Sequence, residues 1–357
     1  MTSTRTDTQV VIVGAGQAGL AVAYYLRRFE LVPGTDFILY DRGPWTGGAW
    51  QHRWDALKLG SAHHVNDLPG MAELGLSFET ADRLLPARDI VAGYYRRYEE
   101  HYGLKVRRPV TVTSVFDRGA DLVVQHTEGE TATRVVVNAS GSWGAPFVPY
   151  YPGMNTFAGR HVHTSSYLSA SEFEGQSVVV VGGGTSAIGF ILELENVAAS
   201  VTWATRRPVD FRDESELTIE GGVAAVAAQD AAARSGLALP SIVSGTGVPR
   251  TRRIAAGIDR GILVERPMFR AIERDGVRWP DGTFTQADAI IWATGFRPEL
   301  RHLAPLKLRE KGGGLTVASG ASWQDPRVFL AGYGPQASTI GANRAGRVIA
   351  RQIMAQL

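Results

Sequence analysis

The sequence of 357 residues contains no cysteine. This absence excludes disulfide frameworks and zinc sites built on thiolates. It also excludes mechanisms that pass electrons through a redox-active pair of thiols in the chain itself. We predict no metal site in this chain.

The chain also lacks an excess of one charge and a long apolar run. Its 37 Lys and Arg residues nearly balance 35 Asp and Glu residues, without a basic stripe of the kind that nucleic acids require. No run reaches the roughly 20 apolar residues that a membrane span needs. The apolar stretch 10–26 is interrupted by glycines, which a phosphate-binding turn explains better than a signal sequence. We therefore predict a cytoplasmic protein that contacts neither nucleic acid nor membrane, with about two domains.

A strand-turn-helix pattern opens the chain. The β-branched stretch 8–13 predicts a strand, residues 20–29 predict a helix, and 37–41 predict a second strand. Between strand and helix, glycines allow the backbone to approach a diphosphate, and an acid at the end of the second strand binds ribose hydroxyls. The alternative is a tight turn without a ligand. The spacing favours a dinucleotide site made of Gly14, Gly16, Gln17, Ala18, Gly19, Asp41 and Arg42.

The same pattern begins again about 165 residues later. A strand over 177–181 precedes a second turn, which comprises Gly182, Gly183, Gly184, Thr185, Ser186 and Ala187. Where an acid would bind the ribose, the chain has Thr205, Arg206 and Arg207. Because guanidinium groups pair well with phosphate, this site favours NADPH over NADH, although NADH stays an option. Alternatively, the two arginines face solvent or are neutralised by Asp210 and Asp213.

The segments around the two turns complete an α/β pattern. Residues 42–86 predict a long loop region, 87–102 a helix, and 105–138 an antiparallel meander of three strands. Residues 222–235 are rich in alanine, and we expect them to form a packed helix of the second domain rather than a flap. A buried strand over 289–293 and a final amphipathic helix over 348–357 follow.

The linker between the two repeats carries a further motif. Residues 157–167 fit the pattern FxGxxxHxxxY through Phe157, Gly159, His163 and Tyr167. Together with the two glycine turns, this motif resembles the flavin-containing monooxygenases over nearly the whole chain. Residues 47–50 look like that family's GGxW stretch, while 138–141 and 293–296 look like its two crossovers between domains.

The resemblance implies two Rossmann-like domains of the three-layer ββα type. An FAD domain would comprise residues 1–165 and 293–357, and an NAD(P)H domain would be inserted over 166–292. It further implies that Gly48, Trp50, Val112, Ala139, Gly141, Gly295 and Gly334 bind cofactor. By alignment, Ser61, His63 and Thr294 are the candidate catalytic residues. The family's N-oxygenating members have an asparagine at the position of Ser61, whereas Asn66 lies five residues later.

The activity implied is that of an FAD-dependent monooxygenase. NADPH would reduce the flavin, O2 would form a C4a-hydroperoxyflavin, and one oxygen would pass to a small sulfide or amine. Baeyer–Villiger oxidation of ketones stays open, although Tyr167 replaces the tryptophan usual in that group. One alternative is an NAD(P)H-dependent flavin oxidase or dehydrogenase without productive oxygenation, and another is a redox-sensing nucleotide-binding module. The expected partners are the small-molecule substrate, O2 and a second copy in a homodimer.

Overall fold

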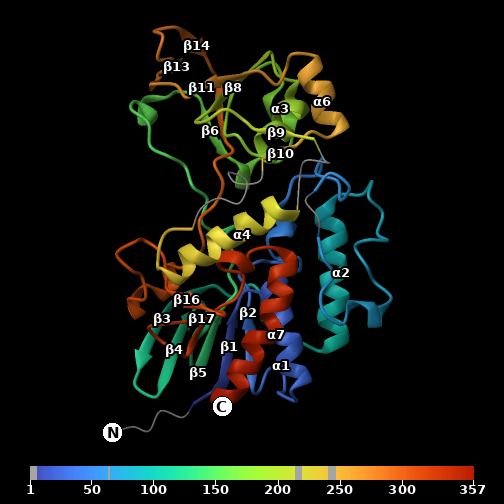
Figure 1. Ribbon diagram of the computed structural model, residues 1–357, viewed down its shortest axis with the longest axis vertical. Coiled ribbons are helices and arrows are strands. Elements are labelled where there is room, and N and C mark those ends of the chain that lie inside the picture. Colours follow the sequence, from blue (N-terminus) through green and yellow to red (C-terminus); the bar gives the residue numbers. More distant parts are fainter. Residues whose placement is uncertain (1–5, 63–64, 214–218, 240–246) are drawn as a thin grey trace. The chain divides into compact units, whose positions relative to one another are not determined.

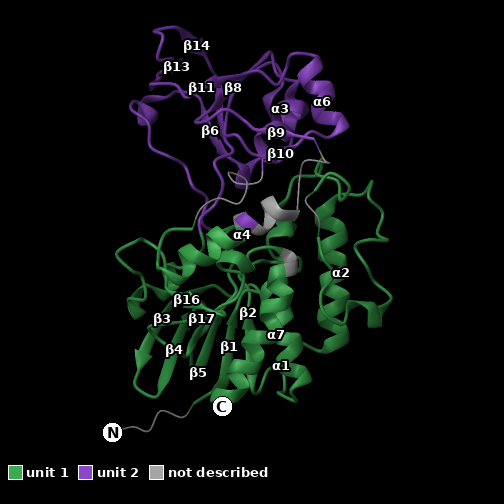
Figure 2. Ribbon diagram, viewed as in Figure 1, with its two compact units in different colours: residues 1–144, 226–240, 298–357 green, residues 145–225, 241–297 purple. Residues whose placement is uncertain are grey.

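The computed structural model describes residues 6–62, 65–213, 219–239 and 247–357. The chain forms two compact units, coloured separately in Figure 2. Unit 1 comprises residues 1–144, 226–240 and 298–357, and unit 2 comprises residues 145–225 and 241–297. The second unit is thus inserted into the first, and the chain returns to unit 1 over residues 226–240 within that insertion.

Unit 1 is built on a sheet of eight strands. Its main path runs β16 (Val317–Ala318), β17 (Ala321–Ser322), β18 (Val328–Leu330), β5 (Gly129–Asn138), β1 (Thr8–Val13) and β2 (Phe37–Tyr40). The four strands from β18 to β2 are parallel, and β3 (Val112–Arg118) and β4 (Asp121–His126) extend antiparallel from β5. The predicted meander over 105–138 is therefore present.

The central strand β1 is buried on both faces because its side chains alternate between two apolar clusters. Val10 and Ile12 pack with the helices α1 (Gln17–Arg28), α2 (Ala87–Tyr102) and α7 (Thr339–Gln356). Val11 and Val13 join the opposite cluster, which includes residues of β4 and of the segment 300–317. Unit 1 therefore has the helix, sheet and meander layers of the predicted three-layer type, with α1 beside α7 (Figure 1).

Unit 2 is built on a fully parallel sheet of five strands. Its order is β11 (Glu265–Pro267), β8 (Ser200–Thr205), β7 (Ser177–Val181), β15 (Ala289–Trp292) and β6 (Arg160–His163). The other elements are α3 (Thr185–Leu194), α6 (Arg252–Asp259), the antiparallel strands β12 (Ala271–Glu273), β13 (Gly276–Arg278) and β14 (Phe284–Gln286), and the pair β9 (Phe211–Arg212) and β10 (Val248–Pro249). Continuous apolar runs in β7 and β15 suit such buried parallel strands.

Short 3-10 helices connect several of these elements. They are η1 (Gly48–His52), η2 (Met71–Leu74), η3 (Met154–Thr156), η4 (Thr164–Ser166), η5 (Ala170–Phe173), η7 (Arg301–Leu306) and η8 (Gly334–Gln336).

The alanine-rich helix α4 (Ile219–Arg234) ends in unit 1 rather than unit 2. Ala233 is buried in the apolar cluster that contains Tyr333, and Leu237 forms a β-bridge with Gly313. The sequence predicts this helix as part of the second domain. The sequence does not show which domain this helix packs against, because small alanine side chains can pack against either one.

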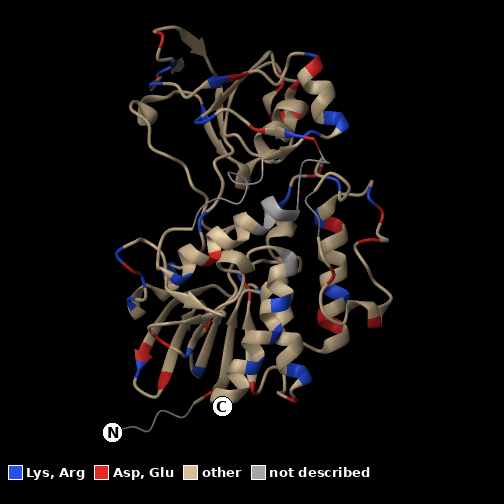
Figure 3. Cartoon of the chain, viewed as in Figure 1, with Lys and Arg blue, Asp and Glu red and all other residues tan. Residues whose placement is uncertain are grey.

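Charged residues of both signs are interspersed over each unit (Figure 3). Among the residues that the structure describes, no helix is long and apolar enough to cross a bilayer. In the same part of the chain, no three His, Asp or Glu side chains come together as metal ligands.

Candidate functional site

The two glycine turns have the same backbone geometry. Gly14 donates to Tyr40 O at 2.7 Å, and Gly182 donates to Ala204 O at 2.9 Å. Both have positive φ, 104° and 136°. A Cβ would lie 2.4 Å from Ala139 O at Gly14 and 2.3 Å from Ala293 O at Gly182, so each position requires glycine. The internal duplication predicted from sequence is therefore a duplication of structure, crossovers included.

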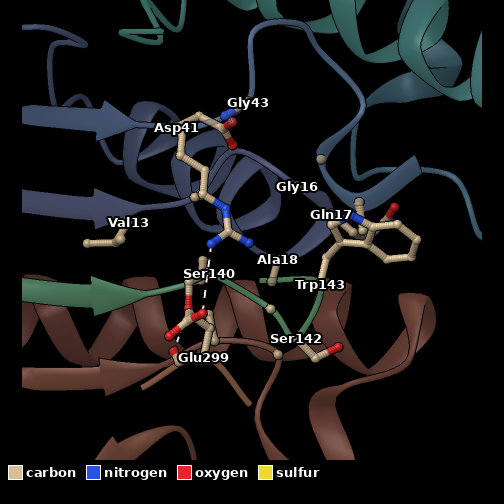
Figure 4. A pocket seen from close by; sticks show the side chains of 18 of the residues that line it. Val13, Gly16, Gln17, Ala18, Asp41, Gly43, Ser140, Ser142, Trp143 and Glu299 are labelled. Carbon is tan, nitrogen blue, oxygen red and sulfur yellow. Dashed lines mark hydrogen bonds and ion pairs between the residues drawn. The ribbon is translucent and has the colours of Figure 1, made fainter. Parts of the chain in front are cut away.

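The first turn borders a pocket of about 410 Å³ that lies wholly within unit 1. Parallel strands β1 and β2 end at this pocket, and α1 begins there (Figure 4). The pocket brings together most of the predicted residues around this turn: Gly14, Gly16, Gln17, Ala18, Asp41, Arg42, Gly48, Trp50, Val112, Ala139 and Gly141. The α1 N-terminus leaves backbone N–H groups available for an anion.

Asp41 closes the turn at the end of β2. Its carboxylate accepts from Ala15 N at 2.6 Å and from Gly43 N at 2.7 Å, and only 7% of the residue is exposed. These bonds fix the carboxylate at the pocket wall. The free lone pairs of its two oxygens can accept ribose hydroxyls.

Gln17 connects the turn to three other segments. Its Nε2 donates to Asn66 O at 3.1 Å and to Asn343 Oδ1 at 2.9 Å, while Oε1 accepts a short hydrogen bond from Tyr95. Asn66, which the alignment sets aside in favour of Ser61, therefore lies beside a residue of the pocket.

A polar network borders the pocket opposite Asp41. Arg42 pairs with Glu299 at 3.8 Å, and Ser140 Oγ lies 2.8 Å from both Asn138 Oδ1 and Glu299 O, two acceptors that share its one hydrogen. His302 Nε2 lies 2.9 Å from Asn138 Oδ1 and serves as a donor to it. Ser140 and Glu299 are visible at the pocket in Figure 4.

The environment of His302 favours its neutral form. Burial first, and the charge of Arg42 second, lower its pKa to about 4. Because the unfolded chain has a histidine pKa near 6.5, the contribution of His302 to stability is complete above about pH 6.5 and is lost as the pH falls through about 4.

We therefore expect the free energy of unfolding to fall by about 2–3 kcal/mol more between pH 7.5 and pH 4.5 in the wild type than in His302→Gln. Glutamine retains a donor toward Asn138 but does not titrate. Urea unfolding curves at the two pH values test this expectation. Parallel losses of stability in both proteins would assign the acid sensitivity to other groups.

Several predicted residues lie away from this pocket. Gly19 supports the turn from behind, because its Cβ would lie 1.9 Å from Gly14 O. Gly334 packs near Ala233 of α4, and Gly332 lines the pocket in its place. Ser61 is exposed and donates to Lys58 O. His63 lies outside the described residues.

The second turn, at β7 and α3 of unit 2, places Gly184, Thr185, Ser186 and Ala187 at a helix start. Thr205 occupies the position of Asp41, because Gly182 bonds to the residue before it as Gly14 does before Asp41. A carboxylate does stand nearby: Glu265 Oε2 accepts from Thr205 Oγ1 at 3.1 Å, and both its oxygens lie 3.1 Å from Val209 N.

Glu265 thus holds both ends of the short loop that carries Arg206 and Arg207. The two arginines are exposed. Asp210, one of the acids weighed as their partner, pairs instead with Arg212 at 2.6 Å. Both arginine side chains are therefore exposed on a loop whose two ends are hydrogen-bonded to Glu265.

The linker motif forms contacts inside unit 2. His163 Nε2 donates to Gly295 O at 3.0 Å, and Tyr167 packs against Phe190 and donates to Glu193 at 3.0 Å.

Thr294, in the second crossover, donates a short hydrogen bond to Phe147 O. Phe157 packs on His161, and a Cβ on Gly159 would clash with Asp288 O. These contacts give the four motif residues a structural role and join the motif to the second crossover.

Sequence reasoning missed several pocket residues. Glu299 lies 159 residues from Ser140 along the chain and His302 lies 164 residues from Asn138, and no local pattern indicates either residue. Ser140 lies inside the crossover motif 138–141, so the sequence could have predicted it as a pocket residue. Arg53 and Trp143 also line the pocket.

Comparison with known proteins identifies the family. Residues 11–223, more than half of the chain, match the family described as pyridine nucleotide-disulphide oxidoreductase. The structure superposes on a flavin-containing monooxygenase from Stenotrophomonas maltophilia with a TM-score of 0.80 and 31% identity, covering 99% of both chains.

Two curated relatives match over shorter lengths. An uncharacterized oxidoreductase, CzcO of Bacillus velezensis, is 27% identical over 56% of either chain. Senecionine N-oxygenase of Tyria jacobaeae is 27% identical over 54% of this chain and 46% of its own. The matched part of this chain thus spans about half the length of these two relatives.

The matched family, the shared fold and the duplicated glycine turns agree: this chain is an oxidoreductase that belongs to the pyridine nucleotide-disulphide oxidoreductase family and, among its members, to the flavin-containing monooxygenases.

Proposed function

We propose that this protein is an FAD-dependent, NADPH-using monooxygenase that oxygenates a small soft nucleophile, a sulfide or an amine. The observation that carries the proposal is the pocket at the N-terminus of α1, where the first glycine turn, Asp41 and Gly48 converge. Its counterpart in unit 2 repeats the turn geometry with Thr205 at the position of the acid and two arginines directly after it. In this proposal, unit 1 is the FAD domain and unit 2 the NADPH domain.

The residues around the pocket in unit 1 fit a dinucleotide. A Cβ on Gly16 would have Gly48 Cα, 3.8 Å away, as its nearest neighbour, so the wall here consists of bare backbone. Such a surface allows a diphosphate to approach the α1 N–H groups. Asp41 would accept ribose hydroxyls, and Val112, Ala139 and Gly141 would contact the rest of the nucleotide.

The second turn would hold the reduced nicotinamide dinucleotide. Gly184, Thr185, Ser186 and Ala187 would bind its diphosphate at the start of α3, and Gly295 and Thr294 would lie toward the nicotinamide. Arg206 and Arg207 would pair with the 2′-phosphate, which favours NADPH.

When bound, the flavin supplies the oxygen-activating chemistry, and the protein supplies binding, orientation and exclusion of water. The chain has no cysteine, so its own side chains cannot pass electrons to a disulfide as the family name would suggest. Because a dithiol relay within the chain is excluded, we propose O2 as the electron acceptor, with one oxygen atom transferred to a substrate. The name of the N-oxygenase relative supports a soft nucleophile as that substrate.

A coupling measurement tests the proposal. Purified enzyme is supplied with NADPH and a methyl thioether, and NADPH oxidation, O2 uptake, sulfoxide and hydrogen peroxide are followed together. We expect one sulfoxide for each NADPH and O2 consumed, with little peroxide. Release of all the oxygen as hydrogen peroxide would instead support an NADPH oxidase, and lactone or ester from a cyclic ketone would support Baeyer–Villiger chemistry.

A further inference from the structure

An arginine with an unusual environment lines the pocket of unit 1. The guanidinium of Arg53 lies 4.4 Å from the ring centroid of Trp143 and 5.6 Å from that of Trp50. His52 stacks on Trp143 with an interplanar angle of 8°. All four side chains line the same pocket.

The charge on Arg53 lacks a partner in the described part of the chain. Its Nε is buried and makes no hydrogen bond there. Burial is the cause of its low pKa, about 10, so the side chain is still a cation at neutral pH. Nearby arginines differ, because Arg42 faces Glu299 and Arg88 pairs with Asp55 at 2.6 Å.

Burial of the Arg53 charge lowers the stability of the folded protein unless an anion binds to it. A buried N–H group that lacks an acceptor, as at Arg53 Nε, loses the hydrogen bond it made with water. The aromatic contacts recover part of this loss through cation–π attraction. They also hold the planar group, so that its N–H donors form a fixed fork suited to two oxygens of one anion.

The short segment 48–53 places this arginine near the first glycine turn. Gly48, at the start of η1, approaches Gly16 so closely that a Cβ on Gly48 would lie 2.7 Å from Gly16 Cα. Trp50 lies in the same 3-10 helix, and Arg53 directly follows it. The segment therefore joins the guanidinium to the wall where the α1 N-terminus also favours negative charge.

We propose that Arg53 is an anion-binding residue of this pocket and that its ligand is the diphosphate of the bound dinucleotide. This inference rests on the proposed function of the pocket in unit 1. A second source of the same chemistry is a carboxylate on the substrate. The guanidinium fork fits both, and separate arms of the test distinguish them.

The first arm compares flavins that differ in phosphate. Wild type, Arg53→Met and Arg53→Lys are stripped of flavin and titrated with FAD, riboflavin and inorganic pyrophosphate, with flavin fluorescence and calorimetry as readouts. Arg83, an exposed arginine that donates to Gly60 O, provides the control Arg83→Met. We expect Arg53→Met to weaken FAD and pyrophosphate binding about 10- to 100-fold and to leave riboflavin binding unchanged. Arg53→Lys retains the charge but loses the two parallel N–H donors, so its affinity for FAD and pyrophosphate should lie between those of the wild type and Arg53→Met.

The second arm measures KM for a thioether that carries a carboxylate and for a neutral one. If Arg53→Met retains FAD affinity but raises KM about tenfold for the acid alone, the anion is the substrate's. Equal losses for FAD and riboflavin would show that Arg53 only supports the fold and would overturn the inference, as would wild-type values throughout. Wild-type protein that binds neither FAD nor pyrophosphate would overturn the proposed function as well.

Discussion

Gly16→Ala is expected to yield a folded protein that no longer retains FAD. The backbone of Gly16 has φ −85°, which any residue adopts, and its Cβ would meet no atom closer than 3.8 Å. The methyl group therefore fits the protein itself but projects into the space proposed for the diphosphate. We expect FAD affinity to fall at least about 100-fold, since backbone N–H contacts to the phosphate would be lost. Absorbance at 450 nm of the purified protein measures this loss, and circular dichroism checks the fold.

Two further glycine variants serve as controls for this result. Gly14→Ala is strained, with positive φ and a Cβ 2.4 Å from Ala139 O, so we expect it to lose stability as well as flavin. Gly184→Ala, in the second turn, has no atom within 4 Å and should retain FAD while its KM for NADPH rises. A yellow Gly16→Ala protein with a full complement of flavin would contradict the assignment of the first turn.

Replacement of Arg206 and Arg207 by alanine should reverse the preference between the two nicotinamide cofactors. Each charge-assisted hydrogen bond to a phosphate contributes about 1.5–3 kcal/mol. Because both contacts are lost together, we expect KM for NADPH to rise by at least about 100-fold, with a change of less than about threefold for NADH. Steady-state kinetics with both cofactors at saturating substrate measure the effect. Equal changes in KM for NADPH and NADH would show that the two arginines do not pair with the 2′-phosphate.

Glu265 provides a control for that prediction, because it holds the arginine loop through Thr205 and Val209. Glu265→Gln retains one carbonyl oxygen that can accept from both Thr205 and Val209, and it should behave like the wild type in its cofactor preference. Glu265→Ala releases both ends of the loop. It should raise KM for NADPH with little change in kcat, a split that general destabilisation would not produce.

The sequence by itself determined the duplicated architecture. Strand, glycine turn and helix are local patterns, so residues 8–41 and 177–205 indicated both nucleotide sites without knowledge of distant contacts. The helix over 87–102 and the meander before Asn138 followed from periodicity, and the structure confirms them. The missing acid at Thr205 was likewise readable, since its position is counted from the second turn.

Tertiary structure alone decided which distant residues complete these sites. Glu299 and His302 meet Arg42 and Asn138 only because the chain returns to unit 1 after residue 297. Glu265 reaches Thr205 from a neighbouring strand, and α4 packs beside Gly334 rather than in unit 2. The aromatic environment of the Arg53 guanidinium likewise includes Trp143, which lies 90 residues later in the chain. Local pattern specifies elements, whereas burial, charge pairing and pocket walls arise from contacts between segments that sequence spacing does not encode.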